Sequence, residues 1–173
     1  IPCRNGLRDL LRLLDSLTVS PPGTKFRVIV CDDGSDEEDI GGALNLSPVD
    51  DDQIVEGDWE NQFPLYVMKN TTAKGCVIDC DLDFSSAPEA WGRRMIRKIE
   101  TNPGIGILAP LMLYPDGRIQ SAGGKTNSQG LPFKHRFQGL PGDHSAAQEE
   151  TAVVYAPGAC WMMRHELTAI VGG

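Results

Sequence analysis

Apolar positions along the chain alternate between helical spacing and short continuous runs, and this alternation predicts an α/β protein. Leucines at 10, 11, 13, 14 and 17 share one helix face, which predicts an amphipathic helix over residues 9–17. The Pro-Pro-Gly sequence at 21–23 ends that helix. The run Phe26–Cys31 (FRVIVC) is apolar and β-branched, as is typical of a buried strand.

The same alternation continues through the second half of the chain. Residues 75–84 (GCVIDCDLDF) predict a second strand, residues 88–101 a helix that begins at a proline, and residues 105–113 a third strand. Residues 121–150 lack a clear period and predict a long surface loop, and residues 151–155 are a fourth strand candidate. Strands alternating with helices favour a mostly parallel sheet.

The length and charge of the chain narrow the function classes. A chain of 173 residues fits one domain over residues 1–173. The formal net charge of −8 argues against nucleic acid as the main partner, because phosphate binding needs a basic face. No apolar run reaches the length of a membrane span. The first residues resemble neither a signal peptide nor a translation start, so we expect a fragment.

The five cysteines predict reduced thiols in a cytoplasmic protein. Their number is odd and their spacing scattered. Cys76 and Cys80, if both lie in one strand, are roughly 13 Å apart, too far for a disulfide. No histidine neighbours a cysteine at zinc spacing. Five buried thiols in a reducing compartment are the expectation.

Acidic residues end two of the predicted strands. Asp32 and Asp33 follow the first strand, and Asp79 and Asp81 end the second. Ligands of open α/β sheets bind beyond the carboxyl ends of strands, where carboxylates repel each other unless a cation joins them. In an extended segment Asp79, Asp81 and Asp83 point to one face, so two carboxylates can share one Mg²⁺ or Mn²⁺. A solvated loop explains either cluster alone equally well, but two clusters favour the metal.

These segments together resemble the family 2 glycosyltransferases of the GT-A fold. The opening IPCRN, a leucine-rich helix and VIVCDDGSD at 28–36 look like the start of that family. VIDCD at 77–81 resembles its D-x-D strand end, and residues 102–124 resemble a stretch of its rhamnosyltransferase-like members. GACWMMR at 158–164 resembles its acceptor-side G-A-C motif. Each match alone is weak, but their order and number make the joint match specific.

The resemblance implies a Rossmann-like nucleotide-sugar-binding fold with a mostly parallel central sheet. It implies an inverting, metal-dependent transfer of a sugar from a dTDP or UDP donor to a hydroxyl of a saccharide or lipid-linked acceptor. Mg²⁺ or Mn²⁺ is the implied cofactor, and cell-surface polysaccharide biosynthesis the implied process. The implied location is cytoplasmic, either free or peripheral to the inner face of the membrane.

The resemblance also carries roles onto individual residues. Asp32 is the implied acceptor for the N3–H of uracil or thymine. No residue here matches the family's general base, which we expect beyond Gly173. The complete implied sets are Pro2, Arg4, Asp32, Asp33 and Asp79 for the nucleotide, Asp81 with Asp79 for the metal, and Gly158, Ala159 and Cys160 on the acceptor side.

One departure and three alternatives stay open. Only nine positions separate Asn70 from Asp79, where the family has a longer helix, so residues are absent from this region or it is shortened. A GT-A-like nucleotidyltransferase would need a glycine-rich phosphate loop, and the first eight residues contain only Gly6. A non-catalytic nucleotide-sugar or carbohydrate-binding module would need no base. A response-regulator-like domain also has paired aspartates after a strand, but it leaves the Asp79-Cys80-Asp81 segment and residues 105–124 unexplained.

Overall fold

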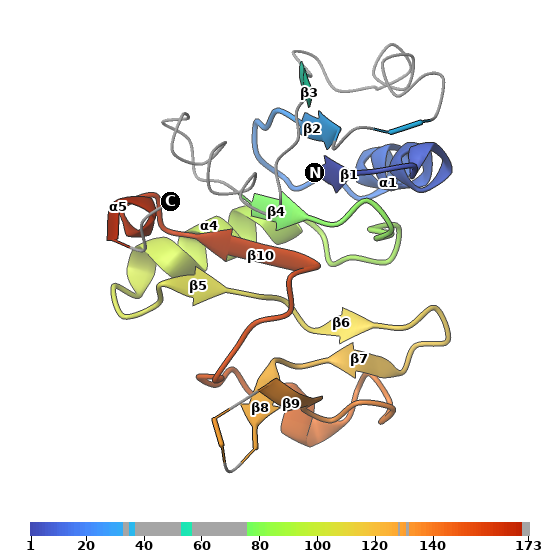
Figure 1. The fold of residues 1–173 in the computed structure, drawn as a ribbon. Coiled ribbons are helices and arrows are strands. Elements are labelled where there is room, and N and C mark those ends of the chain that lie inside the picture. The colour runs from blue at the N-terminus through green and yellow to red at the C-terminus, as the bar shows by residue number, and fades with distance from the viewer. Residues whose placement is uncertain (33–34, 37–52, 57–75, 128, 131, 171–173) are drawn as a thin grey trace.

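The computed structural model is mixed α/β (Figure 1) and describes residues 1–32, 35–36, 53–56, 76–127, 129–130 and 132–170. The first sheet is parallel and has the order β1-β2-β3, formed by Pro2–Cys3, Ile29–Asp32 and Gln53–Glu56. In its register Cys3 lies opposite Asp32, so β1 and β2 end at the same edge of the sheet.

A second three-stranded sheet is antiparallel. Its central strand is β10 (Cys160–Met163), which pairs with β4 (Cys76–Ile78) on one side and β5 (Ile107–Leu108) on the other. Cys160 lies opposite Ile78, so the beginning of β10 meets the end of β4. The chain therefore returns through the long 109–159 segment to complete this sheet.

Two antiparallel hairpins form the lower part of the molecule in Figure 1. One joins β6 (Met112–Leu113) to β7 (Ile119–Ser121). The other joins β8 (Gly124–Thr126) to β9 (Pro132–His135). A 3₁₀ turn follows at Ser145–Ala147, and a short helix, α5 (Leu167–Ile170), follows β10.

Helices α1 (Leu7–Val19) and α4 (Trp91–Thr101) supply much of the core. Their apolar stripes face inward, as helical periodicity predicts. Within the described residues, no helix has both the length and the apolar character that crossing a membrane requires. The buried residues of the two stripes are Leu10, Leu13, Leu14 and Leu17 in α1, with Trp91, Met95 and Ile99 in α4.

The Pro-Pro-Gly segment at 21–23 ends α1 and also supports the start of α4. The Arg93 N–H donates to the Pro22 carbonyl at 2.8 Å, which satisfies a helix N-terminal donor that has no intrahelical partner. Gly23 has a φ of +72°, and a Cβ there would lie 2.3 Å from the Cβ of Ala90. Only glycine meets both conditions at this contact.

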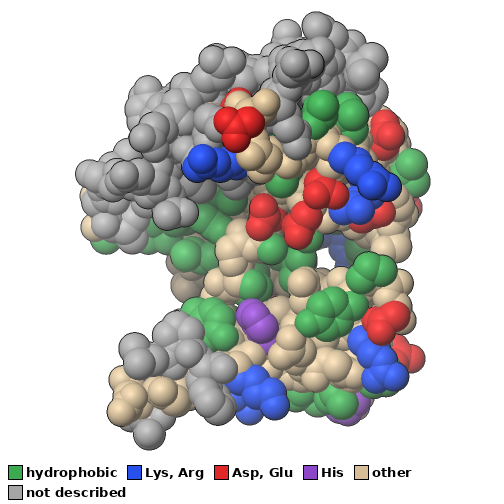
Figure 2. Space-filling model, turned by 45° about the vertical axis from the view of Figure 1, so that its right-hand side comes forward, with side chains coloured by type: hydrophobic (Ala, Val, Ile, Leu, Met, Phe, Trp, Pro, Cys, Tyr) green, Lys and Arg blue, Asp and Glu red, His purple; other side chains and the backbone are tan. Residues whose placement is uncertain are grey.

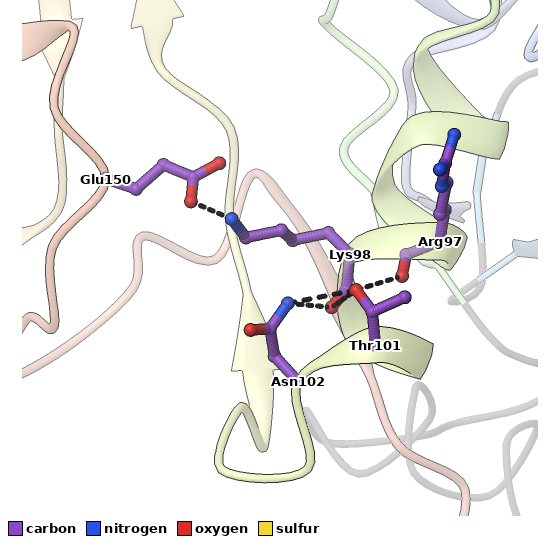
Figure 3. Close-up of polar contacts among 5 residues, drawn as sticks. All are labelled: Arg97, Lys98, Thr101, Asn102 and Glu150. Carbon is purple, nitrogen blue, oxygen red and sulfur yellow. Dashed lines mark hydrogen bonds and ion pairs between the residues drawn. The ribbon is translucent and has the colours of Figure 1, made fainter.

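Side chains close the other end of α4 (Figure 3). The Thr101 hydroxyl donates to the Arg97 carbonyl at 2.9 Å, and the Asn102 amide donates to the Lys98 carbonyl at 2.9 Å. The Lys98 ammonium forms an ion pair with Glu150, which ties the loop before β10 to this helix.

Arg164, the residue after β10, also serves the end of α4. Its guanidinium donates to the carbonyls of Ile99 and Asn102, and to the Ile105 carbonyl at 2.8 Å. A cation at a helix C-terminus interacts favourably with the helix dipole as well. The strand β10 is thus joined to α4 by hydrogen bonds as well as by packing.

Both predicted helices are confirmed, with shifted ends. Residues 9–17 lie inside α1, which is longer by two residues at each end. The helix predicted from residue 88 begins at Trp91, because Ala90 has a φ of 53° and lies outside the helical region. The strand predicted over 26–31 is β2, whose first residue is Ile29.

The other predicted strands differ more from the structure. Residues 105–113 form two strands in different sheets, β5 and β6, because Pro110 between them has no N–H to donate to a ladder. Residues 151–155 form no strand, and only Tyr155 makes an isolated bridge, to Gly124. Conversely, the predicted loop 121–150 contains the β8–β9 hairpin.

The prediction of one mostly parallel central sheet holds only for β1–β3 among the described residues. The remaining described pairings are antiparallel: β10 runs between β4 and β5 in the opposite direction, and β6–β7 and β8–β9 are hairpins. Asp33, Asn70 and the acidic run at 50–52 lie outside the described residues.

Candidate functional site

Asp32 lies at the end of β2, where hydrogen bonds join the loops after β1 and β2. Its Oδ1 accepts from the Ser35 N–H at 3.1 Å and from the Ser35 hydroxyl at 2.5 Å. The Ser35 hydroxyl oxygen accepts from the Asn5 N–H at 2.8 Å, and the Asp36 N–H donates to the Asn5 side chain at 2.7 Å. These contacts hold the Asp32 carboxylate in place through Oδ1, and among the described residues no hydrogen bond to Oδ2 occurs.

The D-x-D segment is a turn, so the prediction of an extended segment is wrong. Strand β4 ends at Ile78, where its pairing with β10 also ends. The Leu82 N–H donates to the Asp79 carbonyl at 3.3 Å, and Asp79 Oδ1 accepts from the Cys80 N–H at 3.1 Å. Such side-chain bonds to the backbone compete with strand pairing and favour turns.

Asp83 does not join the other two aspartates on one face. Its Oδ1 accepts from the Ser85 N–H at 2.8 Å, and these Ser85 hydrogen bonds lower the pKa of the Asp83 carboxyl. The structure therefore leaves Asp79 and Asp81 as the pair of carboxylates at the turn.

The D-x-D turn contacts both the Gly158–Cys160 segment and the end of β1. The Asp79 N–H donates to the Ala159 carbonyl at 2.7 Å. A Cβ placed on Gly6 would lie 3.2 Å from the Cys80 sulfur and 3.3 Å from the Cys3 sulfur, so both thiols converge beside the start of α1. Because Cys3 also lies opposite Asp32, these contacts gather the carboxyl ends of β1, β2 and β4 and the start of β10.

The other predicted site residues differ in their exposure to solvent. Arg4 is exposed in the bend after β1, and Gly158 is exposed just before β10. Cys160 is buried, with 1% of its surface exposed, so its side chain belongs to the core and only its backbone borders the turn. Pro2 lies in β1.

The two aspartates of the turn carry an electrostatic cost. Burial, followed by the charge of Asp81, raises the pKa of the Asp79 carboxyl, and the Cys80 N–H partly opposes this. A cation between the carboxylates would remove the repulsion. No group of three or more His, Cys, Asp or Glu that could hold a metal occurs in the described part of the chain. Two carboxylates fit a divalent ion whose other ligands are phosphate oxygens and water.

The Cys80 thiol in the turn stays protonated at neutral pH. All five cysteines are free. A hydrogen bond with Cys3, followed by burial, raises the pKa of the Cys80 thiol, and the Asp79 and Asp81 charges add to the effect. The residue between the two aspartates therefore adds no third negative charge. Cys80 lies in the turn, outside β4, so the strand geometry assumed for the Cys76–Cys80 spacing does not apply.

Comparisons with known proteins give two weak similarities. No known family model matches the chain, and no solved structure matches it significantly. The chain is 25% identical over 176 residues to the O-antigen biosynthesis protein RfbC of Myxococcus xanthus, covering 95% of this chain and 13% of that protein. It is 26% identical over 186 residues to the uncharacterized protein y4gI of Sinorhizobium fredii, covering 100% of this chain and 20% of that protein. The chain thus spans a fifth or less of the length of either relative.

Helix α1 holds the D-x-D turn and the segment after it through three polar residues that sequence reasoning missed. The Arg12 guanidinium donates to the Asp81 carbonyl at 2.9 Å. The Ser16 hydroxyl accepts from the Phe84 N–H at 2.9 Å, and the Ser20 hydroxyl donates to the Ala87 carbonyl at 3.0 Å.

The spacing of these three residues explains why they act together. Arg12 and Ser16 are four positions apart on one face of α1, and Ser20 is the residue that follows the last turn of this helix. We call Arg12, Ser16 and Ser20 the α1 polar row. The sequence did contain a signal, since Ser16 and Ser20 interrupt a leucine-rich stretch at helical spacing. Buried serines there need partners, and Phe84 and Ala87 in the segment after the turn supply them.

Replacing Asp79 with Asn is expected to raise the stability of the protein at neutral pH. Because the folded-state pKa is raised, the folded state disfavours the carboxylate, and stability is lost as pH rises above the ordinary value of 3.8. Asn removes that cost and keeps an acceptor for the Cys80 N–H. Melting temperatures at pH 7 and at a pH below 3.8 should show the gain only at pH 7.

Asp83→Asn is the matched control for this experiment. Its carboxyl has a lowered pKa, so it contributes stability above pH 3.8 that is lost as pH falls. The two variants should therefore shift the melting temperature at pH 7 in opposite directions. A destabilised Asp79→Asn protein at pH 7 would contradict the buried-charge cost.

Proposed function

We propose that this chain is the nucleotide-sugar-binding core of a glycosyltransferase that acts in polysaccharide biosynthesis. One observation carries the proposal: the structure gathers Asp32, the Asp79–Asp81 turn and the Gly158–Cys160 segment at one edge, through the Cys3–Cys80 and Asp79–Ala159 contacts. The similarity to a protein named for O-antigen biosynthesis supports the process. The parallel β1–β3 sheet, with its acidic carboxyl end, supports the GT-A fold as part of the proposal.

Asp32 would bind the base of the donor. Its Oδ2 can accept the N3–H of uracil or thymine, while Ser35 holds Oδ1. Adenine has no ring N–H on its pairing edge, and the N1–H of guanine lies farther from the ribose than the pyrimidine N3–H, so with either purine the carboxylate would lose its partner. This arrangement supports a UDP or dTDP sugar as the donor.

Asp79 and Asp81 would hold Mg²⁺ or Mn²⁺ together with the diphosphate. When bound, such an ion offsets the negative charge that builds up on the leaving diphosphate. Because the Asp79 N–H is bonded to Ala159, an acceptor placed along residues 158–160 would lie next to the reacting sugar. Inverting transfer to a saccharide or lipid-linked hydroxyl, at the cytoplasmic face of the membrane, belongs to the same proposal.

Nucleotide selectivity tests this function. In calorimetry with Mn²⁺, UDP and dTDP should bind at least about fivefold more tightly than ADP and GDP, since leaving the partly buried Asp32 carboxylate unpaired costs about 1 kcal/mol or more. Removing Mn²⁺ should weaken UDP and dTDP binding, because the phosphates lose the ion that joins them to the Asp79 and Asp81 carboxylates.

The same measurement can reject the proposal. Equal affinity for all four nucleotides would remove Asp32 from a base pocket. No binding of UDP or dTDP at any Mn²⁺ concentration would overturn the nucleotide-sugar function itself. Asp32→Asn should reduce the ratio of UDP or dTDP affinity to ADP or GDP affinity. The Asn side chain can present its NH₂ group to the base, whereas the carboxylate can only accept a hydrogen bond.

A further inference from the structure

Positive charge is concentrated in one segment of this acidic chain. Residues 117–142 contain Arg118, Lys125, Lys134 and Arg136 and no Asp or Glu. Their formal charge is therefore +4, although the whole chain carries −8. A local basic surface on an acidic protein indicates a negatively charged partner.

The inner face of the β8–β9 hairpin is anchored to the protein. Gly124 and His135 are paired across the two strands. His135 Nδ1 lies 2.9 Å from the hydroxyl of Ser121, of which 1% is exposed. The Tyr155 ring packs directly on Gly124, where a Cβ would lie 1.9 Å from a ring carbon. The hairpin is thus held from this side by buried contacts.

The outer face of the same hairpin carries the lysines. Side chains alternate between the two faces of a strand, so Lys125 and Lys134 face away from Ser121 and Tyr155. Both are exposed and lie directly opposite each other in the register. Like charges in that position destabilise a strand pair. Among the described residues, neither lysine has an ion pair that would offset the repulsion.

Arg136 extends this basic surface. Its N–H donates to the Gly123 carbonyl at 2.9 Å, which continues the pairing of the hairpin beyond β9. Its guanidinium carbon lies 4.9 Å from the centre of the Phe137 ring, which limits its freedom. We call Lys125, Lys134 and Arg136 the hairpin basic face.

We propose that the hairpin basic face docks on the anionic surface of a phospholipid bilayer. Its cations lie along an exposed two-stranded ribbon, an arrangement that matches headgroups spread over a plane. Val154, which is 67% exposed, precedes the bridge residue Tyr155 and adds an apolar side chain beside the hairpin. The remaining negative charge has little effect at contact, because salt screens it beyond about 8 Å.

The position of the hairpin suits this role. Figure 1 places β8 and β9 at the opposite end of the molecule from the β1–β3 sheet. On the face that Figure 2 shows, acidic side chains gather above a hollow, and Lys and Arg side chains lie both above and below it. A bilayer at the hairpin would therefore leave the β1–β3 edge accessible. The proposal does not depend on the transfer reaction proposed above.

Vesicle sedimentation tests the proposal. The chain should bind vesicles of phosphatidylglycerol and phosphatidylcholine, bind phosphatidylcholine alone weakly, and detach as salt is raised. Each basic residue near an anionic bilayer strengthens binding about fivefold, so Lys125→Gln/Lys134→Gln should weaken it about 25-fold. The matched control is Lys25→Gln/Arg27→Gln, which removes the same charge from two exposed residues before β2 and should change binding less than about twofold.

Several outcomes would overturn the proposal. Equal binding to both kinds of vesicle, or an equal loss in the control, would show that the hairpin basic face is not a membrane surface. Displacement by inorganic phosphate at matched ionic strength would indicate a discrete phosphate site instead. An oligomer that the hairpin variant alone converts to a monomer in gel filtration would show that the lysines contact a second copy. Circular dichroism of both double variants checks that they fold.

Discussion

Asp81→Asn is expected to weaken the Mn²⁺-dependent binding of UDP or dTDP by about a hundredfold. Mutating a residue that only bonds to a metal ligand already lowers metal affinity about ten- to a hundredfold. Removing a carboxylate that binds the metal directly should therefore lower it by about a hundredfold or more. The Arg12 guanidinium bonds to the backbone carbonyl of residue 81, not to its side chain, so the turn itself should survive the change. Calorimetry with and without Mn²⁺ separates the metal-dependent part of the affinity.

Asp83→Asn provides the control, since it makes the same charge change two residues further along. Its side chain is bonded to Ser85, outside the pair of carboxylates. Metal-dependent affinity should therefore stay within about twofold of the parent protein. If both variants bind UDP with Mn²⁺ as the parent does, the turn does not hold the metal. If both lose affinity equally, general charge rather than Asp81 is responsible.

Ser16→Ala is expected to reduce the free energy of unfolding by about 1–3 kcal/mol. The Phe84 N–H would lose its acceptor in a buried position, where water does not replace it easily. Phe84 also stacks on Trp91 at a ring-centre distance of 4.5 Å, so its displacement would disturb the start of α4. Urea unfolding measures the loss, and UDP binding measures the effect on the turn.

Thr18→Ala is the matched control on the same helix. The Ser16 and Thr18 hydroxyls both donate to a carbonyl three residues earlier, at 2.7 and 2.6 Å. Only Ser16 also receives the Phe84 N–H, and Thr18 is exposed. Thr18→Ala should change stability by less than about 0.5 kcal/mol. Similar losses in the two variants would mean that the α1 polar row does not hold the 81–87 segment.

Periodicity predicted the helices because their burial is repeated along one face. Leu10, Leu13 and Leu17 all face the core, and their spacing alone predicts this without knowledge of the other helices and strands. The direction of β10 was beyond such reasoning. Its apolar residues would suit a parallel or an antiparallel strand equally well. The path of the chain over residues 109–159 determines which strands it pairs with. Pro110 did carry a local signal, because a residue without an N–H interrupts a strand.

The functional roles of the candidate site residues stay predictions, and the contacts that support them were not predicted. In the structure Asp79 is bonded to Ala159, and Asp32 lies opposite Cys3 in the register of β1 and β2. The turn was missed because aspartate side chains that bond to nearby N–H groups leave no periodic pattern. Lys125 and Lys134 were missed for a related reason, since their hairpin is short, polar and rich in glycine.

The central place of β10 in its sheet also determines when the candidate site can be assembled during synthesis. Strands β4 and β5 do not pair with each other, so each keeps an unpaired edge until residues 160–163 have left the ribosome. The Asp79–Ala159 hydrogen bond links residues 80 positions apart and must form equally late. Contacts of such long separation slow folding. The nascent chain can therefore build α1 early, but it passes through a stage in which the Asp79–Asp81 turn has no support from β10 and strand β4 is open to aggregation.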